Sequence, residues 1–256
     1  ADLLHGIPDL RELGVAVEVS GLDLAKAFKK SRLAAEKLSK GVQFLLKKNA
    51  VEYIKGEGRL ASPTEIVLAD ERRIQARAII LATGSRPREL PGLAFDETTV
   101  LSSTGALLLQ KLPKRIAILG AGAIGMEMGY VWNAFGAEVT IIEALDRILP
   151  LEDAEAAALA RKIFEKRGVK FITGAFASAG SRGPKGLGLD LKPAKEGQAA
   201  DFPSRVDADA VLVAVGRVPN SAGLGLEEIG VALERGFVPV GDYGQTAAKG
   251  VYAIGD

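Results

Sequence analysis

Three glycines near the middle of the chain have the spacing of a phosphate-binding loop. They lie in Gly120-Ala-Gly122-Ala-Ile-Gly125, which follows an apolar run at residues 116–119 and opens a helix-forming segment. In such a loop the first glycine permits a tight turn, the second lets a pyrophosphate approach bare backbone, and the third lets the helix sit close to the sheet. The phosphates then meet free N–H groups at the positive end of the helix dipole. The segment therefore predicts a dinucleotide-binding finger.

An acidic residue follows the finger near the expected distance. Glu143 lies 18 residues beyond Gly125, at the end of a second apolar run, 138–142. A carboxylate there would bind the hydroxyls of an adenine ribose and repel a 2′-phosphate, which favours NAD over NADP. A simpler alternative stays open, because glycine-rich turns are common. In it the glycines only form a turn and Glu143 is a solvated residue at the end of a strand.

From residue 115 strand-like and helix-like segments alternate, which is typical of a parallel sheet with helical crossovers. The predicted helices are 123–135 and 153–167; the first has an apolar face of Ile124, Met128, Val131 and Phe135. The predicted buried strands are 116–119, 138–142, 169–172, 210–215 and 251–254. Residues 174–206, with glycine-rich turns at 182–186 and 196–197, predict an antiparallel meander.

The part of the chain before residue 115 has a different pattern. Residues 22–48 predict one long helix, in which lysines separate the apolar residues Phe28, Ala35, Leu38, Val42 and Leu45. Short segments at 51–54, 66–68 and 78–82 predict strands. A proline- and glycine-containing connector follows and ends near Pro113.

Composition excludes several classes of function. The 33 basic and 32 acidic residues nearly cancel, so the chain has no field that would attract nucleic acid or an anionic membrane. No uninterrupted apolar run reaches about 18 residues, and no signal-peptide pattern is seen, so a membrane span is not expected. Cysteine is absent, which excludes disulfides, thiolate metal sites and cysteine nucleophiles from these residues. The single histidine, His5, has no second histidine to pair with and is expected to be a packing or surface residue.

Three further motifs follow one another along the chain. They are Ala82-Thr-Gly-Ser-Arg-Pro87, Val215-Gly-Arg-Val-Pro-Asn220 and Tyr252-Ala-Ile-Gly-Asp256. Together with the finger, this ordered set resembles the pyridine nucleotide–disulfide oxidoreductases. The resemblance implies an α/β fold of two related FAD/NAD(P)-binding Rossmann-like domains, with a parallel sheet plus an antiparallel meander. It implies a partial FAD-binding domain over 1–112, an NAD-binding domain over 113–241, and a return strand to the FAD domain over 242–256.

Within that family the chain is most similar to the dihydrolipoamide dehydrogenases. The motifs that carry this closer likeness are Leu101-Ser-Ser-Thr-Gly-Ala-Leu107, Val131-Trp132 and Gly223-Leu-Gly-Leu-Glu-Glu228. Glutathione reductases usually carry arginines near the position of Glu143 to bind NADP, and no arginine replaces it here. This absence again favours NAD.

The resemblance implies two sets of cofactor-binding residues. The expected NAD contacts are Gly120, Ala121, Gly122, Ala123, Ile124, Gly125, Met126, Glu127, Glu143, Ala177 and Gly216. The expected FAD contacts are Gly58, Thr83, Gly84, Ser85 and Asp256, with Asp256 accepting a hydrogen bond from a ribityl hydroxyl. Glu127 is the residue expected to position the nicotinamide; alternatively it is an ordinary residue on a helix face. No metal site and no catalytic residue are expected within these residues.

The family's reaction passes electrons from dihydrolipoamide, through a disulfide and flavin, to NAD. The resemblance implies partners that carry dihydrolipoamide, such as the lipoyl domain of a 2-oxo acid dehydrogenase or glycine cleavage complex, and a parent homodimer in the cytoplasm or mitochondrial matrix. These 256 residues lack the family's first glycine finger, its CxxxxC pair and its His-Glu pair. We therefore expect the isolated chain to bind NAD weakly, to hold FAD poorly and to show no dihydrolipoamide oxidation.

Three other interpretations stay open from the sequence. One is another enzyme of the same fold group, such as an NAD(P) transhydrogenase or a mercuric-ion reductase. The second is a non-catalytic nucleotide-binding module. The third is that a separate chain supplies the missing pieces.

Overall fold

The computed structural model describes residues 1–183, 186–195 and 201–256. The turn expected at 196–197 and the centre of the turn expected at 182–186 therefore lie outside the described residues. The chain divides into two compact units. The first unit comprises Ala1–Lys37 and Pro87–Gly216, and the second comprises Leu38–Arg86 and Arg217–Asp256.

A five-stranded parallel sheet forms the centre of the first unit, in the order β6-β13-β7-β8-β9. Its strands are β6 Val100–Leu101, β7 Arg115–Leu119, β8 Glu138–Glu143, β9 Lys170–Thr173 and β13 Ala210–Val213. All four residues of β13 are buried, as are the last four of β7. A parallel sheet covered on both faces needs apolar residues at every position of its central strands, which explains the continuous apolar runs in the sequence.

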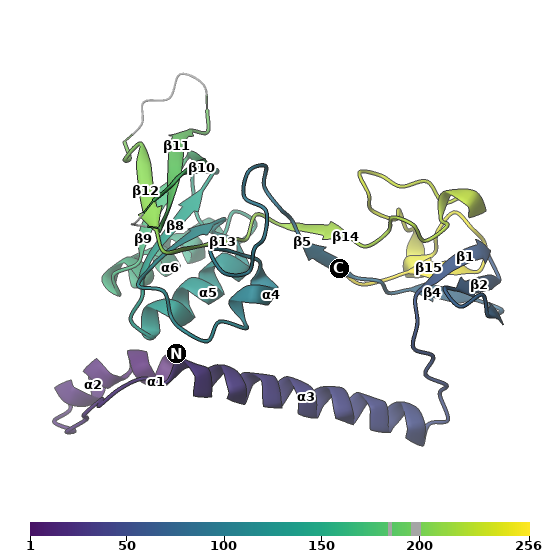
Figure 1. Ribbon diagram of the computed structural model, residues 1–256, viewed down its shortest axis with the longest axis horizontal. Coiled ribbons are helices and arrows are strands. Elements are labelled where there is room, and N and C mark those ends of the chain that lie inside the picture. Colours follow the sequence, from purple (N-terminus) through teal and green to yellow (C-terminus); the bar gives the residue numbers. More distant parts are fainter. Residues whose placement is uncertain (184–185, 196–200) are drawn as a thin grey trace. The chain divides into compact units, whose positions relative to one another are not determined.

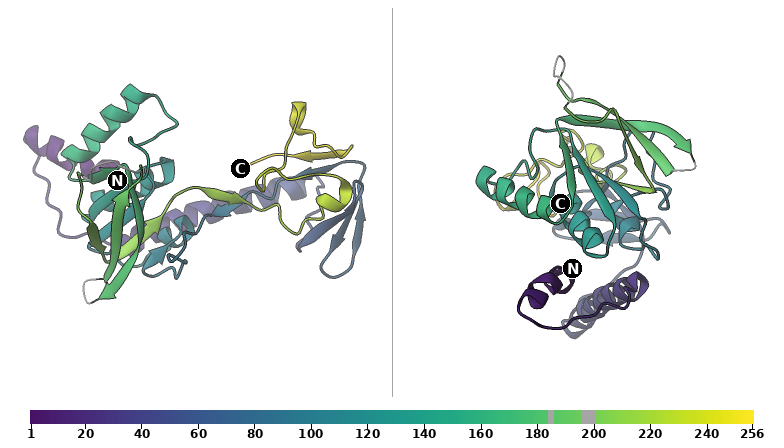
Figure 2. Two further views of the ribbon diagram at one scale, coloured as in Figure 1. Left: turned by 90° about the horizontal axis from the view of Figure 1, so that it is seen from above. Right: turned by 90° about the vertical axis from the view of Figure 1, so that its left-hand side faces the viewer.

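Helices cover one face of this sheet and a meander covers the other (Figures 1 and 2). The helices are α5 Ala123–Ala134 and α6 Ala154–Lys166; the antiparallel strands are β10 Ala175–Gly183, β11 Gly186–Pro193 and β12 Arg205–Ala208. Successive residues of a strand point to opposite faces. Thus Ile118 of β7 packs in the core with Trp132 of α5, while its neighbour Ala117 packs with Leu189 of the meander.

The alternating part of the sequence prediction is confirmed. The expected strands and helices from residue 116 onward lie within two residues of the observed ones, and the meander is present. The apolar face predicted for α5 is wrong in part, because Ile124, Val131 and Phe135 are only half-buried. The face against the sheet instead includes Gly125, Gly129 and Trp132, at helical spacing. Two glycines let the helix approach closely, so a search for large apolar residues does not find this face.

The segment 87–112 is more than the expected connector. It contributes strand β6 to the parallel sheet and a short helix, α4 Ser103–Ala106. The hydroxyl of Ser102 caps α4 by accepting from the N–H groups of Thr104 and Gly105, and the carboxylate of Glu97 accepts from the Ser102 hydroxyl. A two-residue strand and a one-turn helix are too short to produce a periodic signal in the sequence.

Short strands and turns build the second unit. An antiparallel sheet contains β1 Gly58–Ser62, β2 Glu65–Leu68 and β3 Arg73–Gln75; the parallel pair is β4 Ile79–Leu81 with β15 Val251–Ala253, and β5 Ser85–Pro87 pairs with β14 Arg217–Pro219. Two 3-10 turns, η1 Glu227–Ile229 and η2 Asp242–Gly244, complete the unit. Its core includes Leu60, Ile79, Leu226 and Val251. The strand expected at 51–54 is wrong, because these residues adopt no regular structure.

The two units have different boundaries from the domains expected on the resemblance. Val100 and Leu101 are buried in the cores on the two faces of the parallel sheet, so residues 87–112 belong to the first unit. Leu226 and Val231 pack with Leu60, so the segment after residue 216 belongs to the second. Which nucleotide each unit binds stays a prediction.

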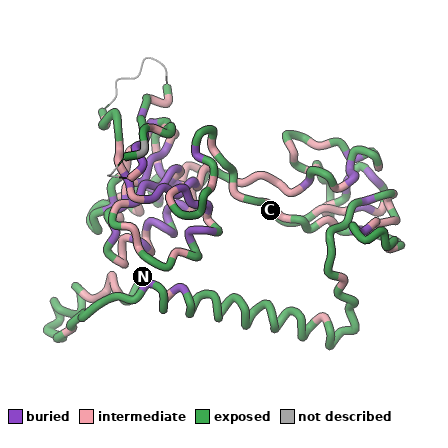
Figure 3. Tube along the Cα trace, in the orientation of Figure 1, coloured by how far each residue is buried: buried purple, intermediate pink, exposed green. Residues whose placement is uncertain are grey.

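The N-terminal helices are α1 Asp2–His5, α2 Ile7–Glu12 and α3 Leu24–Lys48. The helix expected at 22–48 is thus confirmed, but only Leu24 and Phe28 of α3 are buried (Figure 3). His5 packs on the ring of Tyr130, with ring centroids 4.5 Å apart, and burial lowers its pKa. Within the described ranges, no group of acidic or histidine side chains could hold a metal ion. None of the described helices combines the length and apolar character needed to cross a membrane.

Candidate functional site

The glycine finger lies at the carboxyl end of β7, where neighbouring parallel strands also end. Gly120 directly follows β7, and its N–H donates to the carbonyl of Ile142 on β8 at 2.8 Å. Its φ of +100° lies in the region that favours glycine, and an added Cβ would collide with the carbonyl of Ala214, which follows β13. The tight turn therefore requires glycine at position 120.

The other two finger glycines have different surroundings. Gly122 is the N-cap of α5, and a Cβ there would have no described atom within 4 Å. A Cβ on Gly125 would instead collide with the carbonyl oxygen of Gly120. Gly125 is thus required by helix packing, whereas the protein itself does not require glycine at 122. The open backbone at a helix N-terminus fits an approaching phosphate.

Glu143 ends β8 and holds the finger through its side chain. Its Oε2 accepts a hydrogen bond from the N–H of Ala121 at 2.7 Å, and its Oε1 accepts from the N–H of Leu145 at 2.9 Å. The residue is only 9% exposed. The alternative of a solvated residue at a strand end is therefore wrong. Its contact with a ribose stays a prediction.

The remaining residues of the expected NAD set lie at different places in the first unit. Gly216 follows β13 with a φ of +114°, and its carbonyl accepts from the N–H of Arg88. Because β13, β7 and β8 are adjacent and parallel, Gly216, Gly120 and Glu143 share one edge of the sheet. Glu127 is exposed on α5 and lines a hollow of about 440 Å³ with Thr104 of α4. Ala177 lies on β10, opposite Leu191, in the meander.

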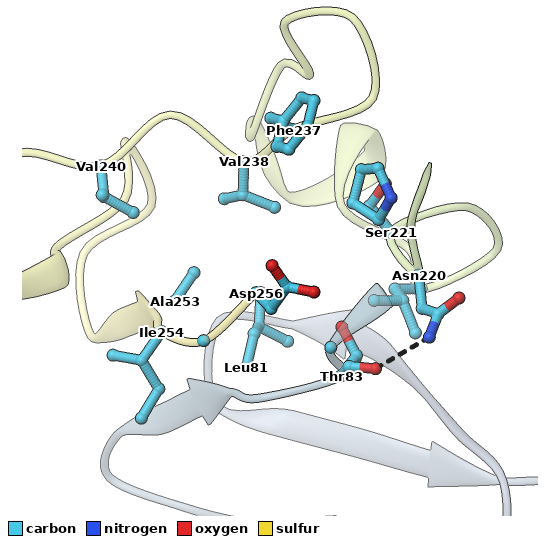
Figure 4. Close-up of a pocket in the computed structure, with 14 residues that line it drawn as sticks. Leu81, Thr83, Asn220, Ser221, Phe237, Val238, Val240, Ala253, Ile254 and Asp256 are labelled. Carbon is cyan, nitrogen blue, oxygen red and sulfur yellow. Dashed lines mark hydrogen bonds between the residues drawn. The ribbon is translucent and has the colours of Figure 1, made fainter. Parts of the chain in front are cut away.

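Most of the expected FAD residues gather at a cavity of about 140 Å³ in the second unit (Figure 4). Thr83, Gly84 and Asp256 line it. The carboxylate of Asp256 lies among the lining side chains, which come from several segments. Gly58 is at the start of β1 and is not one of the lining residues; a Cβ there would come within 2.9 Å of Ile66.

Two residues that sequence reasoning missed hold this cavity wall. Asn220 fixes the Thr83-Gly84 turn: its Nδ2 donates to the carbonyl of Thr83 at 3.0 Å, and its N–H donates to the carbonyl of Gly84 at 2.9 Å. Arg217 binds Ser85 and Asp256. Both belong to the motif Val215-Gly-Arg-Val-Pro-Asn220, in which only Gly216 is an expected cofactor contact. The polar side chains of Arg217 and Asn220 in this motif are the sequence signal from which these contacts could have been predicted.

The carboxylate of Asp256 has two donors on one oxygen. The hydroxyl of Ser85 and the Nε of Arg217, the latter at 2.8 Å, both donate to its Oδ2. Hydrogen bonding from Ser85 and then from Arg217 lowers the pKa of Asp256. The carboxylate is thus an ionised acceptor at neutral pH, suited to a hydroxyl donor.

Comparisons with known proteins cover nearly the whole chain. The family described as pyridine nucleotide-disulphide oxidoreductase matches residues 12–256. Dihydrolipoyl dehydrogenase 3 of Pseudomonas aeruginosa is 40% identical over 252 residues, 97% of this chain and 53% of that protein. Dihydrolipoamide dehydrogenase of Chaetomium thermophilum is 40% identical over 260 residues, 99% of this chain and 50% of that protein. The chain therefore spans about half the length of the curated relatives it matches.

Solved structures give the same result. LpdA from Mycobacterium tuberculosis superimposes with a TM-score of 0.85 at 28% identity, over 100% of this chain and 55% of that one. The flavoprotein disulfide reductase RclA from Escherichia coli has a TM-score of 0.79 at 27% identity, over 99% of this chain and 54% of that one. These findings confirm the resemblance to dihydrolipoamide dehydrogenases, a group that binds FAD and NAD. The chain belongs to the pyridine nucleotide-disulphide oxidoreductase family.

Proposed function

We propose that these residues form the NAD-binding site and part of the FAD-binding site of a flavoenzyme that oxidises dihydrolipoamide and reduces NAD. One observation carries the proposal furthest. A glycine finger with open backbone at Gly122 stands beside a buried carboxylate, Glu143, in a chain 40% identical to dihydrolipoyl dehydrogenases. That arrangement supports a dinucleotide with a phosphate bridge and an unmodified ribose diol.

The finger acts on the nucleotide through its backbone. The first N–H groups of α5 have no partner within the helix and are available to phosphate oxygens. Glu143 already accepts from Ala121 and Leu145, but each carboxylate oxygen has two acceptor sites, so a ribose diol adds two hydrogen bonds without displacing the backbone. Its charge disfavours a 2′-phosphate at the same place. Gly216 borders the same site, Ala177 contacts the adenosine, and Glu127 positions the nicotinamide.

The second unit contributes to flavin binding. Bound FAD supplies a carrier that exchanges a hydride equivalent with the nicotinamide. Thr83, Gly84 and Ser85 present backbone and hydroxyl groups to it, and Asp256 accepts from a ribityl hydroxyl. Gly58 contributes to the same binding region. The FAD portion would comprise 1–112 with 242–256, and the NAD portion 113–241, of which several residues between 219 and 240 also line the proposed flavin cavity of the second unit.

The dithiol step of the reaction needs groups that these 256 residues do not contain. Dithiol oxidation requires a thiolate that attacks a disulfide and a base that accepts the thiol proton. The 256 residues contain no cysteine, and their one histidine, His5, packs on Tyr130. The partner would be dihydrolipoamide, free or on the lipoyl domain of a 2-oxo acid dehydrogenase or glycine cleavage complex. The whole protein would be a homodimer in the cytoplasm or mitochondrial matrix.

Anaerobic reduction of the flavin tests this function in the full-length protein that carries these residues. NADH should bleach the visible absorbance of the bound flavin, and NADPH should do so poorly. Dihydrolipoamide with NAD⁺ should produce NADH. Reduction of mercuric ion and NAD(P) transhydrogenation, the two alternative activities, should be assayed on the same protein in parallel. A flavin that NADPH reduces better than NADH, or that stays oxidised with dihydrolipoamide, would overturn the proposal.

A further inference from the structure

Two hydrogen bonds hold Ala121 of the glycine finger, one at its N–H and one at its carbonyl. The N–H donates to Glu143 Oε2 at 2.7 Å, and the carbonyl accepts from the N–H of Leu149 at 2.9 Å. Glu143 is the last residue of β8, and Leu149 lies in the loop 144–150 that follows this strand. The end of β8 and its loop therefore fix two successive peptide groups of the finger.

The bond from Leu149 determines where the next N–H of the finger points. The carbonyl of Ala121 and the N–H of Gly122 belong to one planar peptide group, in which they point in opposite directions. Because the carbonyl is held toward the loop, this N–H is directed away from the loop. Within the described residues the N–H of Gly122 has no hydrogen-bond acceptor. It is free to donate to a phosphate oxygen at the start of α5.

Leu149 makes this bond in a conformation that leucine disfavours. Its φ is +45°, in the left-handed region where a side chain crowds the backbone. Its neighbour Ile148 is buried in the core under α5, against which Leu149 also packs. Residues in the left-handed region persist only where surrounding contacts hold them, and they gather at ligand sites. The loop therefore needs contacts that keep Leu149 in place.

Arg147 supplies such a contact within the loop. Its Nη2 donates to the carbonyl of Pro150 at 2.7 Å and so closes a ring around Ile148 and Leu149. Its Nη1 is buried and has no hydrogen-bond partner among the described residues. A buried donor without an acceptor and a strained leucine both reduce stability. What the arrangement positions therefore explains it better than what it stabilises.

We propose that Arg147 is a positioning residue for the pyrophosphate of NAD. It holds Leu149 against the carbonyl of Ala121, and this contact directs the N–H of Gly122 at a phosphate oxygen. Arg147 acts through the loop and needs no contact with the nucleotide. This inference rests on the proposed function, because it takes the finger to be the NAD site.

NAD binding by the full-length protein tests the proposal. Arg147→Met removes the donor and keeps a long side chain, and the half-buried Pro150 can bond to water instead. The NAD dissociation constant should rise about fivefold, the effect of losing one hydrogen bond. The KM for NAD should rise by a similar factor while kcat stays the same, because only binding is affected. Arg147→Lys keeps one donor and should bind NAD within about twofold of the unmodified protein.

A double-mutant cycle separates positioning from attraction between the arginine charge and the phosphates. Leu149→Gly keeps the N–H and adopts a φ near +45° without strain. If Arg147 acts by holding Leu149, adding Arg147→Met to Leu149→Gly should weaken NAD binding by less than about twofold. An electrostatic effect would instead weaken it by about fivefold in both backgrounds.

Arg11 supplies a matched control in the same unit. Its Nη2 donates to the carbonyl of Val17 at 3.0 Å, which is the same kind of bond outside the finger and its loop. Arg11→Met should therefore leave the NAD dissociation constant unchanged.

Three results would overturn the inference alone. They are unchanged NAD affinity in Arg147→Met, an equal loss of NAD affinity with and without Leu149→Gly, and a loss of FAD affinity that accompanies the loss of NAD affinity. The last result would indicate general damage to the fold. Absence of NAD binding by the unmodified protein would overturn the proposed function, and this inference with it.

Discussion

The carboxylate of Glu143 accepts a hydrogen bond from the backbone N–H of Ala121 at 2.7 Å. This bond joins the end of β8 to the finger that follows β7. The residue proposed to recognise the ribose therefore also fixes the loop proposed to hold the phosphates. Changes at position 143 should consequently affect both stability and nucleotide binding.

Removing the Glu143 side chain should destabilise the fold. Glu143→Ala leaves the N–H groups of Ala121 and Leu145 without their acceptor, and an unsatisfied buried N–H costs about 1–3 kcal/mol. Urea unfolding should show a lower free energy of unfolding. Glu138→Ala, at the exposed start of the same strand, should change it by less than about 0.5 kcal/mol. Similar effects of the two substitutions would contradict the role of Glu143 in holding the finger.

The two finger glycines should respond differently to valine. Gly122→Val should abolish NAD binding, because its side chain would occupy the space proposed for the pyrophosphate. The melting temperature should change little, because no described protein atom lies within 4 Å of a Cβ at this position. Gly125→Val collides with the Gly120 carbonyl and should destabilise the fold by about 1–3 kcal/mol as well. Calorimetry gives the NAD affinity and thermal denaturation gives the stability.

Gly21→Val is the control for the valine series, because Gly21 also has no described atom near an added Cβ and lies outside the finger. It should leave NAD affinity unchanged. Normal NAD binding by both finger variants would mean that the finger is only a turn.

The Arg115–Asp209 ion pair should make stability depend on acid pH. Arg115 bonds the Asp209 side chain at 2.5 Å, and this hydrogen bond is the main cause that lowers the pKa of Asp209. The folded chain then binds fewer protons here than the unfolded chain. The stabilisation is therefore present above the unfolded-state pKa of about 3.9 and is lost as the pH falls through the folded pKa.

Asp209→Asn should remove this acid-dependent part. Urea midpoints measured between neutral pH and about pH 2 should fall less steeply for the variant than for the unmodified chain. The effect should be small, because about a third of each side chain is exposed. Parallel curves for the two proteins would show that the pair contributes nothing.

The sequence predicts the parallel sheet well because its signals are local. The apolar strands and the glycines of the finger lie within short windows, and each glycine has one physical requirement. Glu143 also follows from spacing, although its bond to Ala121 does not. That bond depends on two loops meeting at one sheet edge, and no short window of sequence contains both.

The remaining features depend on tertiary packing. Arg217 and Asp256 are far apart in sequence and meet only because β14 pairs with β5 next to the end of β15. Gly125 and Gly129 form the contact face of α5 through the absence of side chains, which an apolar pattern cannot indicate. In α3 the apolar residues Leu38, Val42 and Leu45 are exposed, so the pattern predicted the helix but not the burial of that face.

Titration with NADH and NADPH tests the central claim most directly. A carboxylate facing a phosphate at about 4 Å is unfavourable by about 4 kcal/mol at an effective dielectric of 20, before screening and rearrangement reduce it. The full-length protein should therefore bind NADH well ahead of NADPH, and Glu143→Arg should flatten or reverse that preference. Equal affinity of the unmodified protein for the two nucleotides would contradict the assignment of Glu143 to the ribose and, with it, the proposed NAD site.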